Sequence, residues 1–150
     1  MKNTPPGWPR ISSSLTYDNA SEAIDWLCRA FGFRVRLKVE GEGGRIEHSE
    51  LTFGDGVIMV GDVSGKPGVA HMRSPKQAGG TNTQALFVYV DDIEAHCRRA
   101  GEAGAEITSP LKTSDYGSDY WVDRSYGCVD PGGHHWWFAE RVSTSSTYTP

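Results

Sequence analysis

Few side chains in this sequence could do chemistry, and the most suggestive pair is His48 and Glu50. They lie two positions apart in the segment RIEHSELTF, so on a strand they share one face while Leu51 and Phe53 share the other. If that face meets a ligand, the pair could bind it, or act as general acid and base if their pKa values are shifted. The alternative is a structural ion pair or a wet rim, because paired charges are also common away from active sites.

Three further residues carry polar groups of interest. His134 and His135 are adjacent, so on a straight strand they point to opposite faces and cannot chelate one ion. We expect His134 to support the DPGG turn and His135 to face a ligand. The planar guanidinium of Arg124 could meet an anionic ligand, or it could pair with Asp123, Asp119 or a carboxylate across a dimer. One of the nearby Tyr120 and Trp121 must face the ligand, and the sequence does not decide which.

The cysteines and the remaining histidines give weaker signals. Cys28, Cys97 and Cys128 are odd in number and far apart, which fits neither a disulfide framework nor a zinc site built on a C-x-x-C pair. We interpret them as free thiols. His71 falls in a glycine-rich linker and His96 on a predicted helix, and we expect both to be solvated.

Length and charge restrict the class of protein. With 150 residues and 37% hydrophobic residues the chain is large enough to close a core. A net charge of −4 with scattered basic residues argues against a nucleic-acid partner. No apolar run reaches the roughly 20 residues that span a bilayer, and the start MKNTPPGWPR lacks the apolar stretch of a secretory signal. We therefore expect no membrane partner and a cytoplasmic location.

The chain reads as two similar halves. A strand over 11–17 leads into Asn19 and Glu22, which form a capping box, and Gly32 ends the helix that follows. A strand over 85–90 leads in the same way into Asp91 and Glu94, and that helix ends near Gly104. Glu94 and Gly104 each follow their counterpart by 72 positions, which predicts an internal duplication.

Strand-like segments and tight turns follow each helix. They cover 33–40, 45–53 and 57–62 in the first half and 105–111, 119–129 and 134–141 in the second. This order predicts an α+β fold of two β-α-β-β-β modules that together form a cupped mixed sheet. The expected boundaries are modules at 10–62 and 84–141 within one domain of 10–141, a linker at 63–83, and flexible ends at 1–9 and 142–150.

Alternation along the strands separates an aliphatic face from a face of small, hydroxyl and aromatic groups. A helix packs best on the aliphatic face, so the other face should look into a cavity. Besides His48 and Glu50, the residues expected on the ligand face are Ser12, Ser14, Met59, Phe87, Tyr89, His135 and Trp137.

The sequence resembles the vicinal oxygen chelate superfamily, which contains glyoxalase, bleomycin-resistance proteins and dioxygenases. The resemblance rests on the two leaders SLTYDNASEAIDWLCRAFGF and LFVYVDDIEAHCRRAGEAGA, on HSELTFGDGVIMVGD, and above all on the closing segment RSYGCVDPGGHHWWFAERV. It covers roughly residues 10–141 and is most similar to the bleomycin-resistance-like branch.

That resemblance also implies where a metal would bind. The family's metal enzymes take ligands from the first and last strands of each half, which by register correspond to Ser12, Met59, Ala85 and Trp137 here. A serine, a thioether, a methyl group and an indole do not replace the His, Asp, Glu or Cys donors that a divalent cation needs. We therefore expect no metal and no cofactor.

Two functions follow as hypotheses. The first is a metal-independent binding protein that sequesters an aromatic or antibiotic-like small organic molecule; the resemblance implies a homodimer with its pockets at the dimer interface. The second is a metal-independent lyase or isomerase that uses His48 and Glu50. The sequence does not disclose which ligand is bound.

Overall fold

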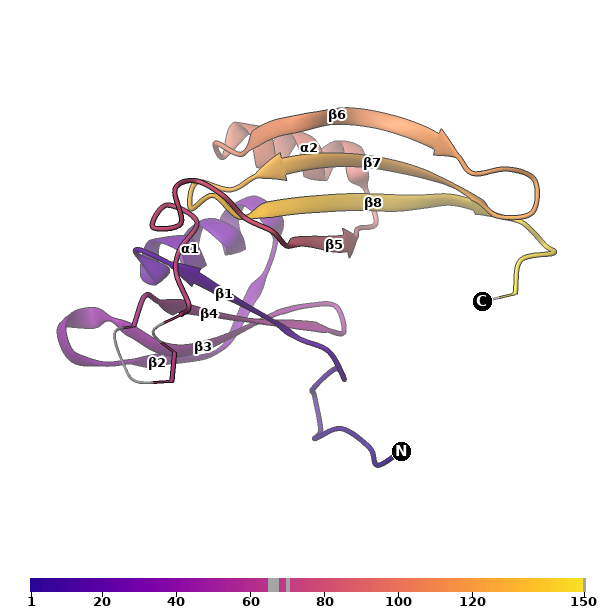
Figure 1. Ribbon diagram of the computed structural model, residues 1–150. Helices are drawn as coiled ribbons and strands as arrows, with labels where there is room; N and C mark the ends of the chain where they lie inside the picture. Colours follow the sequence, from indigo (N-terminus) through magenta and orange to yellow (C-terminus); the bar gives the residue numbers. More distant parts are fainter. Residues whose placement is uncertain (65–67, 70, 150) are drawn as a thin grey trace. The chain divides into compact units, whose positions relative to one another are not determined.

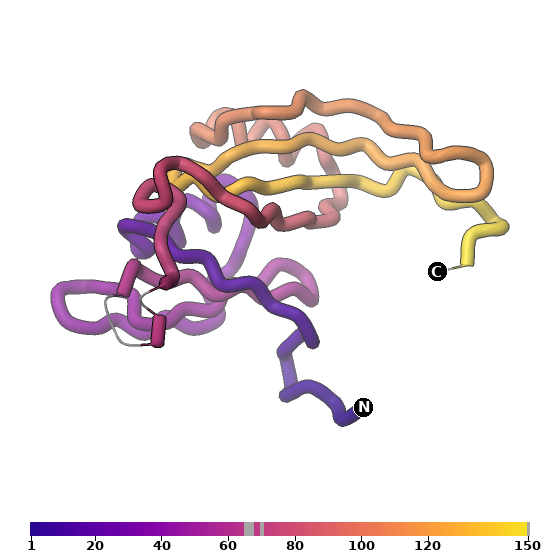
Figure 2. The backbone as a smooth tube through the Cα atoms, in the orientation of Figure 1, coloured from indigo at the N-terminus to yellow at the C-terminus, as the bar shows by residue number. Residues whose placement is uncertain are grey.

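The computed structural model describes residues 1–64, 68–69 and 71–149, and the chain divides into two compact units, Met1–Asn82 and Thr83–Pro150. Each unit contains a four-stranded mixed sheet with one helix packed on one face (Figure 1). The path of the chain within each unit is strand, helix and then three strands (Figure 2). The α+β class and the two β-α-β-β-β modules expected from the sequence are confirmed.

In unit 1 the sheet has the order β1-β4-β3-β2, with β1 parallel to β4 and the other neighbours antiparallel. A short 3-10 helix at Glu42–Gly44 joins β2 to β3. The other elements are β1 at Ser13–Tyr17, α1 at Ala20–Phe31, β2 at Arg34–Glu40, β3 at Ile46–Phe53 and β4 at Gly56–Asp62.

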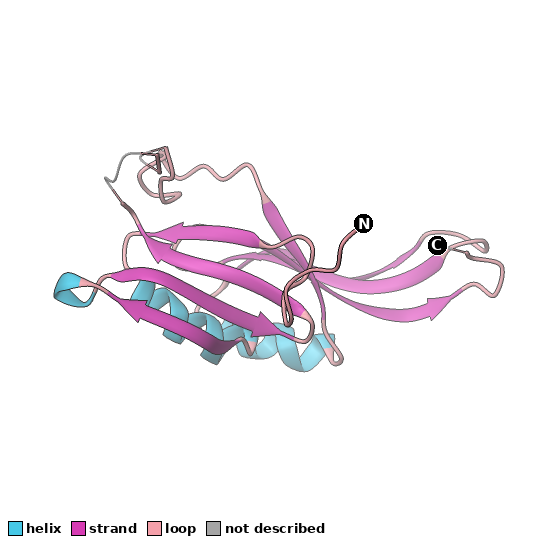
Figure 3. Cartoon of the chain, turned by 90° about the horizontal axis from the view of Figure 1, so that it is seen from below, coloured by secondary structure: helices cyan, strands magenta, loops and turns pink. Residues whose placement is uncertain are grey.

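Helix α1 begins and ends where the sequence predicts. The side chain of Asn19 accepts a hydrogen bond from the backbone N–H of Glu22 at 3.2 Å, which satisfies one of the unpaired donors of the first turn. Gly32 ends the helix in the left-handed conformation, with φ of 87°, where a side chain would be strained. The buried stripe of the helix packs on one face of the sheet, so the opposite face is free of helix (Figure 3).

In unit 2 the sheet has the matching order β5-β8-β7-β6, again with its first pair parallel and the rest antiparallel. Its elements are β5 at Ala85–Tyr89, α2 at Ile93–Glu102, β6 at Glu106–Asp115, β7 at Trp121–Val129 and β8 at His135–Thr144. The chain order of unit 1 therefore recurs.

Two expectations about α2 were wrong. The N-cap is Asp92 and not Asp91: its side chain accepts from the backbone N–H of Ala95 at 2.9 Å. His96 is not solvated but 4% exposed, because it lies on the buried stripe of α2, where its Nδ1 lies 2.7 Å from the hydroxyl of Tyr126. A histidine can occupy such a buried position when a hydroxyl pairs with its ring nitrogen.

Two strands of unit 2 are longer than predicted. Strand β8 continues through Thr144 and pairs with the start of β7, so residues 142–144 are not part of a flexible tail. Strand β6 continues through Asp115 despite Pro110 within it. Because β6 is an edge strand, a residue without an N–H and a run of polar side chains are both tolerated there.

The closing turn fixes which side of β8 is buried. Asp130 is buried and its carboxylate accepts hydrogen bonds from the backbone N–H groups of Gly132 and His134 and from Trp136 Nε1, at 2.9 to 3.0 Å. Trp136 and Phe138 are fully buried, and the ring of Phe138 lies against His96 of α2. Strand alternation therefore places Trp137 on the face without a helix.

None of the helices in the described part of the chain is long and apolar enough to cross a membrane.

Candidate functional site

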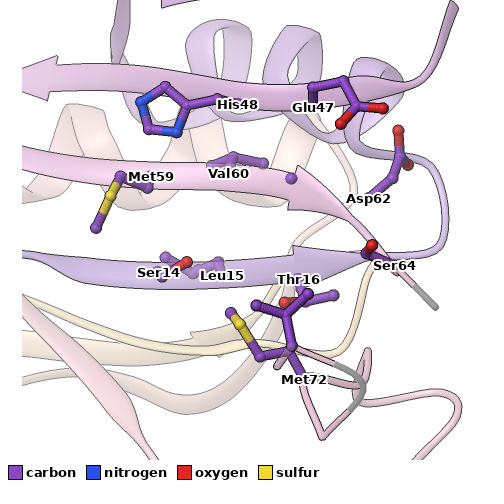
Figure 4. Close-up of a pocket in the computed structure, with 12 residues that line it drawn as sticks. Ser14, Leu15, Thr16, Glu47, His48, Met59, Val60, Asp62, Ser64 and Met72 are labelled. Carbon is purple, nitrogen blue, oxygen red and sulfur yellow. The ribbon is translucent and has the colours of Figure 1, made fainter. Parts of the chain in front are cut away.

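The helix-free face of unit 1 carries a small pocket of about 180 Å³. Ser14 on β1, Met59 on β4 and His48 on β3 line it, and they come from three neighbouring strands (Figure 4). Ser14 and Met59 are register partners. Met72, from the segment after β4, also lines the pocket and lies beside Thr16. The structure thus brings together three of the side chains expected on the ligand face.

Glu50 lies beside this pocket and is tied to its neighbours. His48 Nε2 lies 3.1 Å from Glu50 Oε1, and Arg36 Nε and Nη2 lie 2.8 and 2.7 Å from Glu50 Oε2. The hydrogen bond with His48, followed by the charge and hydrogen bond of Arg36, lowers the pKa of Glu50 below its ordinary value. A carboxylate stabilised in this way is a weaker base, so the geometry matches an ion pair better than an acid–base pair.

The N-terminal segment adds an aromatic ring to this cluster. The guanidinium of Arg36 stacks over the ring of Trp8 at 4.7 Å and donates a hydrogen bond to the carbonyl of Gly7. This segment was expected to be flexible, and Trp8 was not anticipated as a neighbour of the site.

Ser12 has a different setting from Ser14. It precedes β1, and it does not line the pocket. Its hydroxyl oxygen is buried and has no hydrogen-bond partner among the residues that the structure describes.

The helix-free face of unit 2 is aromatic. Phe87 and Trp137 are register partners on β5 and β8, and Phe87 also packs edge-on against Tyr89, with ring centroids 5.3 Å apart. Phe87 is 58% exposed and Tyr89 is 47% exposed. The indole of Trp137 lies over Gly127 of β7, so closely that an added Cβ would lie 3.2 Å from its ring atoms. The missing side chain at Gly127 thus lets the indole lie flat on the sheet.

His135 shares this face with Trp137, two positions away on β8. Arg124 does not lie on this face. Its Nη2 lies 2.6 Å from the carboxylate of Glu94 on α2, so it lies on the helix side of the sheet. The partner is Glu94, and neither Asp123 nor Asp119, which the sequence suggested. We therefore leave Arg124 out of the candidate site.

Two residues on the face of Trp137 were not anticipated as site residues: Asp123 and Arg141. Arg141 follows Trp137 by four positions on β8, and Asp123 is its register partner on β7. Of Tyr120 and Trp121, it is Trp121 that lies on this face: β7 begins at Trp121, two positions before Asp123, and the guanidinium of Arg141 lies over its ring. The alternation of side chains along β8 indicates that Arg141 shares the face of Trp137. The predicted strand ended at residue 141, so Arg141 was not considered.

A divalent cation does not fit the residues at the superfamily's ligand positions. Ser12, Met59, Ala85 and Trp137 offer a hydroxyl, a thioether, a methyl group and an indole where nitrogen or carboxylate donors are needed. Their register partners add one nitrogen donor, since Met59 pairs with Ser14, Trp137 with Phe87 and Ala85 with His135. Within the described ranges there is also no group of three or more His, Cys, Asp or Glu side chains able to hold a metal ion. The three cysteines are free thiols, as expected.

Comparison with known proteins identifies the family. A model of the Glyoxalase/Bleomycin resistance protein/Dioxygenase superfamily matches residues 11–138, and the chain belongs to this superfamily. An uncharacterized protein of Mycobacterium bovis is 32% identical over 135 residues, which is 89% of this chain and 84% of that protein.

Solved structures agree with this assignment. TioX from Micromonospora sp. ML1 is 32% identical with a TM-score of 0.68, over 89% of this chain and 99% of that chain. TnmS3, an antibiotic binding protein from Streptomyces sp. CB03234, is 19% identical with a TM-score of 0.61, over 87% of this chain and 93% of that chain. The likeness to TnmS3 shows the shared fold.

Proposed function

We propose that this protein is a metal-independent binding protein of the bleomycin-resistance type that sequesters a flat aromatic or antibiotic-like molecule. The observation that carries the proposal is the aromatic wall of unit 2, formed by Phe87, Tyr89 and Trp137 on a sheet face without a helix. Large aromatic side chains that stay exposed together mark a binding surface, because an unused apolar patch favours aggregation. Their ring faces suit stacking on another ring.

The alternative, a lyase or isomerase built on His48 and Glu50, has less support. The lowered pKa of Glu50 and its contacts with Arg36 and His48 fit a structural ion pair. A general base needs a pKa nearer to neutral pH. Binding without catalysis is therefore the function we advance.

We also propose that the protein works in the cytoplasm as a homodimer, with the ligand enclosed where two subunits meet. The pocket of about 180 Å³ in unit 1 is smaller than the roughly 300–1,000 Å³ of drug-sized sites, so a further wall is needed to enclose such a ligand. The exposed rings of Phe87 and Tyr89 offer a surface for that purpose. Sedimentation velocity would test this part, and a monomer at micromolar concentration would contradict it.

A thermal-shift screen of flat aromatic natural products tests the function, since a ligand that binds only the folded protein raises its Tm. For each compound found, the affinity of the wild-type protein is compared with that of Trp137→Ala. We expect at least about a tenfold loss, within the range for a buried aromatic anchor. Phe53→Ala is the control, because Phe53 belongs to unit 1, where it packs against Phe33.

The outcomes separate the two functions. Equal affinity in Trp137→Ala and wild type would refute the proposed binding wall. Turnover of a compound by the wild-type protein that disappears in both His48→Ala and Glu50→Ala would favour the enzyme instead.

A further inference from the structure

A polar cluster adjoins the aromatic wall of unit 2. Arg141 Nε donates to Asp123 Oδ1 at 2.5 Å, and the hydroxyl of Tyr89 donates to Asp123 Oδ2 at 3.1 Å. Arg141 Nη2 in turn donates to the hydroxyl oxygen of Tyr89. Asp123 is 4% exposed, so little water reaches its carboxylate. Its partners are instead the guanidinium of Arg141 and the hydroxyl of Tyr89, as a buried charge requires.

Tyr89 and Arg141 both keep their protons at neutral pH. Burial, followed by the hydrogen bond and charge of Asp123, raises the pKa of Tyr89 above its ordinary value. Its hydroxyl therefore stays protonated at neutral pH and continues to donate to Asp123. Arg141 is always charged. The guanidinium is thus held in one position by two partners.

Ring faces hold the same guanidinium from other directions. Its central carbon lies 4.7 Å from the centroid of Trp121 and 5.3 Å from that of Tyr89. Tyr148, from the segment after β8, packs edge-on against Trp121 at 5.0 Å. These contacts restrict the rotamers of Arg141, so little entropy remains to be lost when it binds a further group.

Arg141 still has hydrogen-bonding capacity. A guanidinium has five N–H groups, and two of them are committed to Asp123 and Tyr89. Within the described part of the chain, the acceptor recorded for Nη1 is Thr144 Oγ1 at the long distance of 3.4 Å. About a third of the side chain, 32%, is exposed. The Nη1 end of Arg141 can therefore serve a ligand.

The distance between Trp137 and Arg141 suits a fused-ring molecule. Arg141 lies four positions after Trp137 on β8, which is about 13 Å along a strand. Between them, Ala139 on β8 and its register partner Ser125 on β7 are buried. Tyr89, the register partner of Ala139 on β5, reaches across to Asp123 and is itself 47% exposed. Three fused rings are shorter than this distance, and the breadth of the indole at one end and the length of the arginine side chain at the other make up the difference.

From this arrangement we propose that Arg141, positioned by Asp123 and Tyr89, selects ligands whose flat ring system carries an acceptor oxygen such as a quinone carbonyl. The Nη1 N–H donates to that oxygen while the rings lie along the exposed ring of Tyr89 toward Trp137. The inference rests on the proposed function and names the ligand class of the same site.

The test uses two probes of equal charge that differ in their carbonyl groups, anthraquinone-2-sulfonate and anthracene-2-sulfonate. Calorimetric titration of the wild-type protein should show tighter binding of the quinone by about tenfold, the effect of one hydrogen bond to a charged donor. In Arg141→Gln the preference should fall to near one. The double variant Asp123→Asn with Arg141→Gln avoids leaving a buried unpaired carboxylate, and it should show the same loss.

Arg124→Gln is a matched control, because Arg124 is equally exposed at 33% and equally paired with a carboxylate, but on the helix side of the sheet. It should keep the wild-type preference. If both probes bind equally well and both lose affinity in Trp137→Ala, the selection by Arg141 is refuted while the binding wall stands. If neither probe binds the wild-type protein, both the selection and the binding wall are refuted for fused-ring ligands.

Discussion

Replacing Gly127 by alanine should weaken ligand binding while leaving the fold intact. The new Cβ would lie 3.2 Å from Cζ2 and Cη2 of Trp137 and 3.3 Å from Cβ of Ser109, whereas ordinary van der Waals contacts begin at 3.4 Å. The backbone of Gly127 does not need the left-handed region, so no conformational strain is added. The closest contact is therefore with an indole, which must move by a few tenths of an ångström.

The size of the effect follows from the exposure of that indole. In a closed core such overpacking costs about 1–3 kcal/mol, but Trp137 is only half-buried and can tilt away from the sheet, so we expect about 1 kcal/mol or less. The tilt disturbs the stacking surface. If a ring contact of about 0.5–1.5 kcal/mol is lost, the affinity falls about two- to tenfold.

Urea unfolding and titration with a compound from the thermal-shift screen measure the two quantities. Gly101→Ala is the matched control, since an added Cβ there meets open space on α2. It should raise stability by up to about 1 kcal/mol and leave affinity unchanged. Unchanged affinity in Gly127→Ala alongside a clear loss in Trp137→Ala would refute the reasoning about the ring's position.

Three further predictions concern the buried groups of unit 2. Asp130→Ala should lower the free energy of unfolding by about 3 kcal/mol in urea, because Trp136 Nε1 and two backbone N–H groups lose their acceptor; a loss below about 1 kcal/mol would contradict this account. Burial raises the pKa of Cys128 from 9.0 to about 12, so between these values the folded protein binds more protons than the unfolded one and stability falls as pH rises. The drop in Tm between about pH 8 and about pH 10.5 should therefore be smaller in Cys128→Ala, and an equal drop would refute this assignment. Tyr126→Phe should cost about 1–3 kcal/mol in thermal unfolding, because it removes a hydrogen-bond partner of the buried His96; no change would show that this bond is not stabilising.

The order of elements could be predicted from the sequence because local signals determine it. Asn19 and Gly32 bound α1 through hydrogen bonds and backbone conformations that depend on neighbouring residues alone. The period-two pattern of β8 likewise placed Trp136 and Trp137 on opposite faces, and burial of Trp136 agrees.

Partners distant in sequence could not be predicted in this way. Glu94 lies 30 positions from Arg124, and their pairing depends on which side of the sheet α2 covers. His96 was expected in solvent because histidine is polar. The sequence does not show that the hydroxyl of Tyr126, on β7, lies beside its ring. Such contacts require the packed helix and sheet.

The sequence by itself determined two β-α-β-β-β modules and the aromatic character of one face, since capping, turns and strand alternation act over a few residues. Only the tertiary structure decided that Asp123, Arg141 and Tyr89 form one cluster. The physical reason is that pairing of β5 and β7 with β8 brings together side chains from three segments whose separation along the chain carries no local signal.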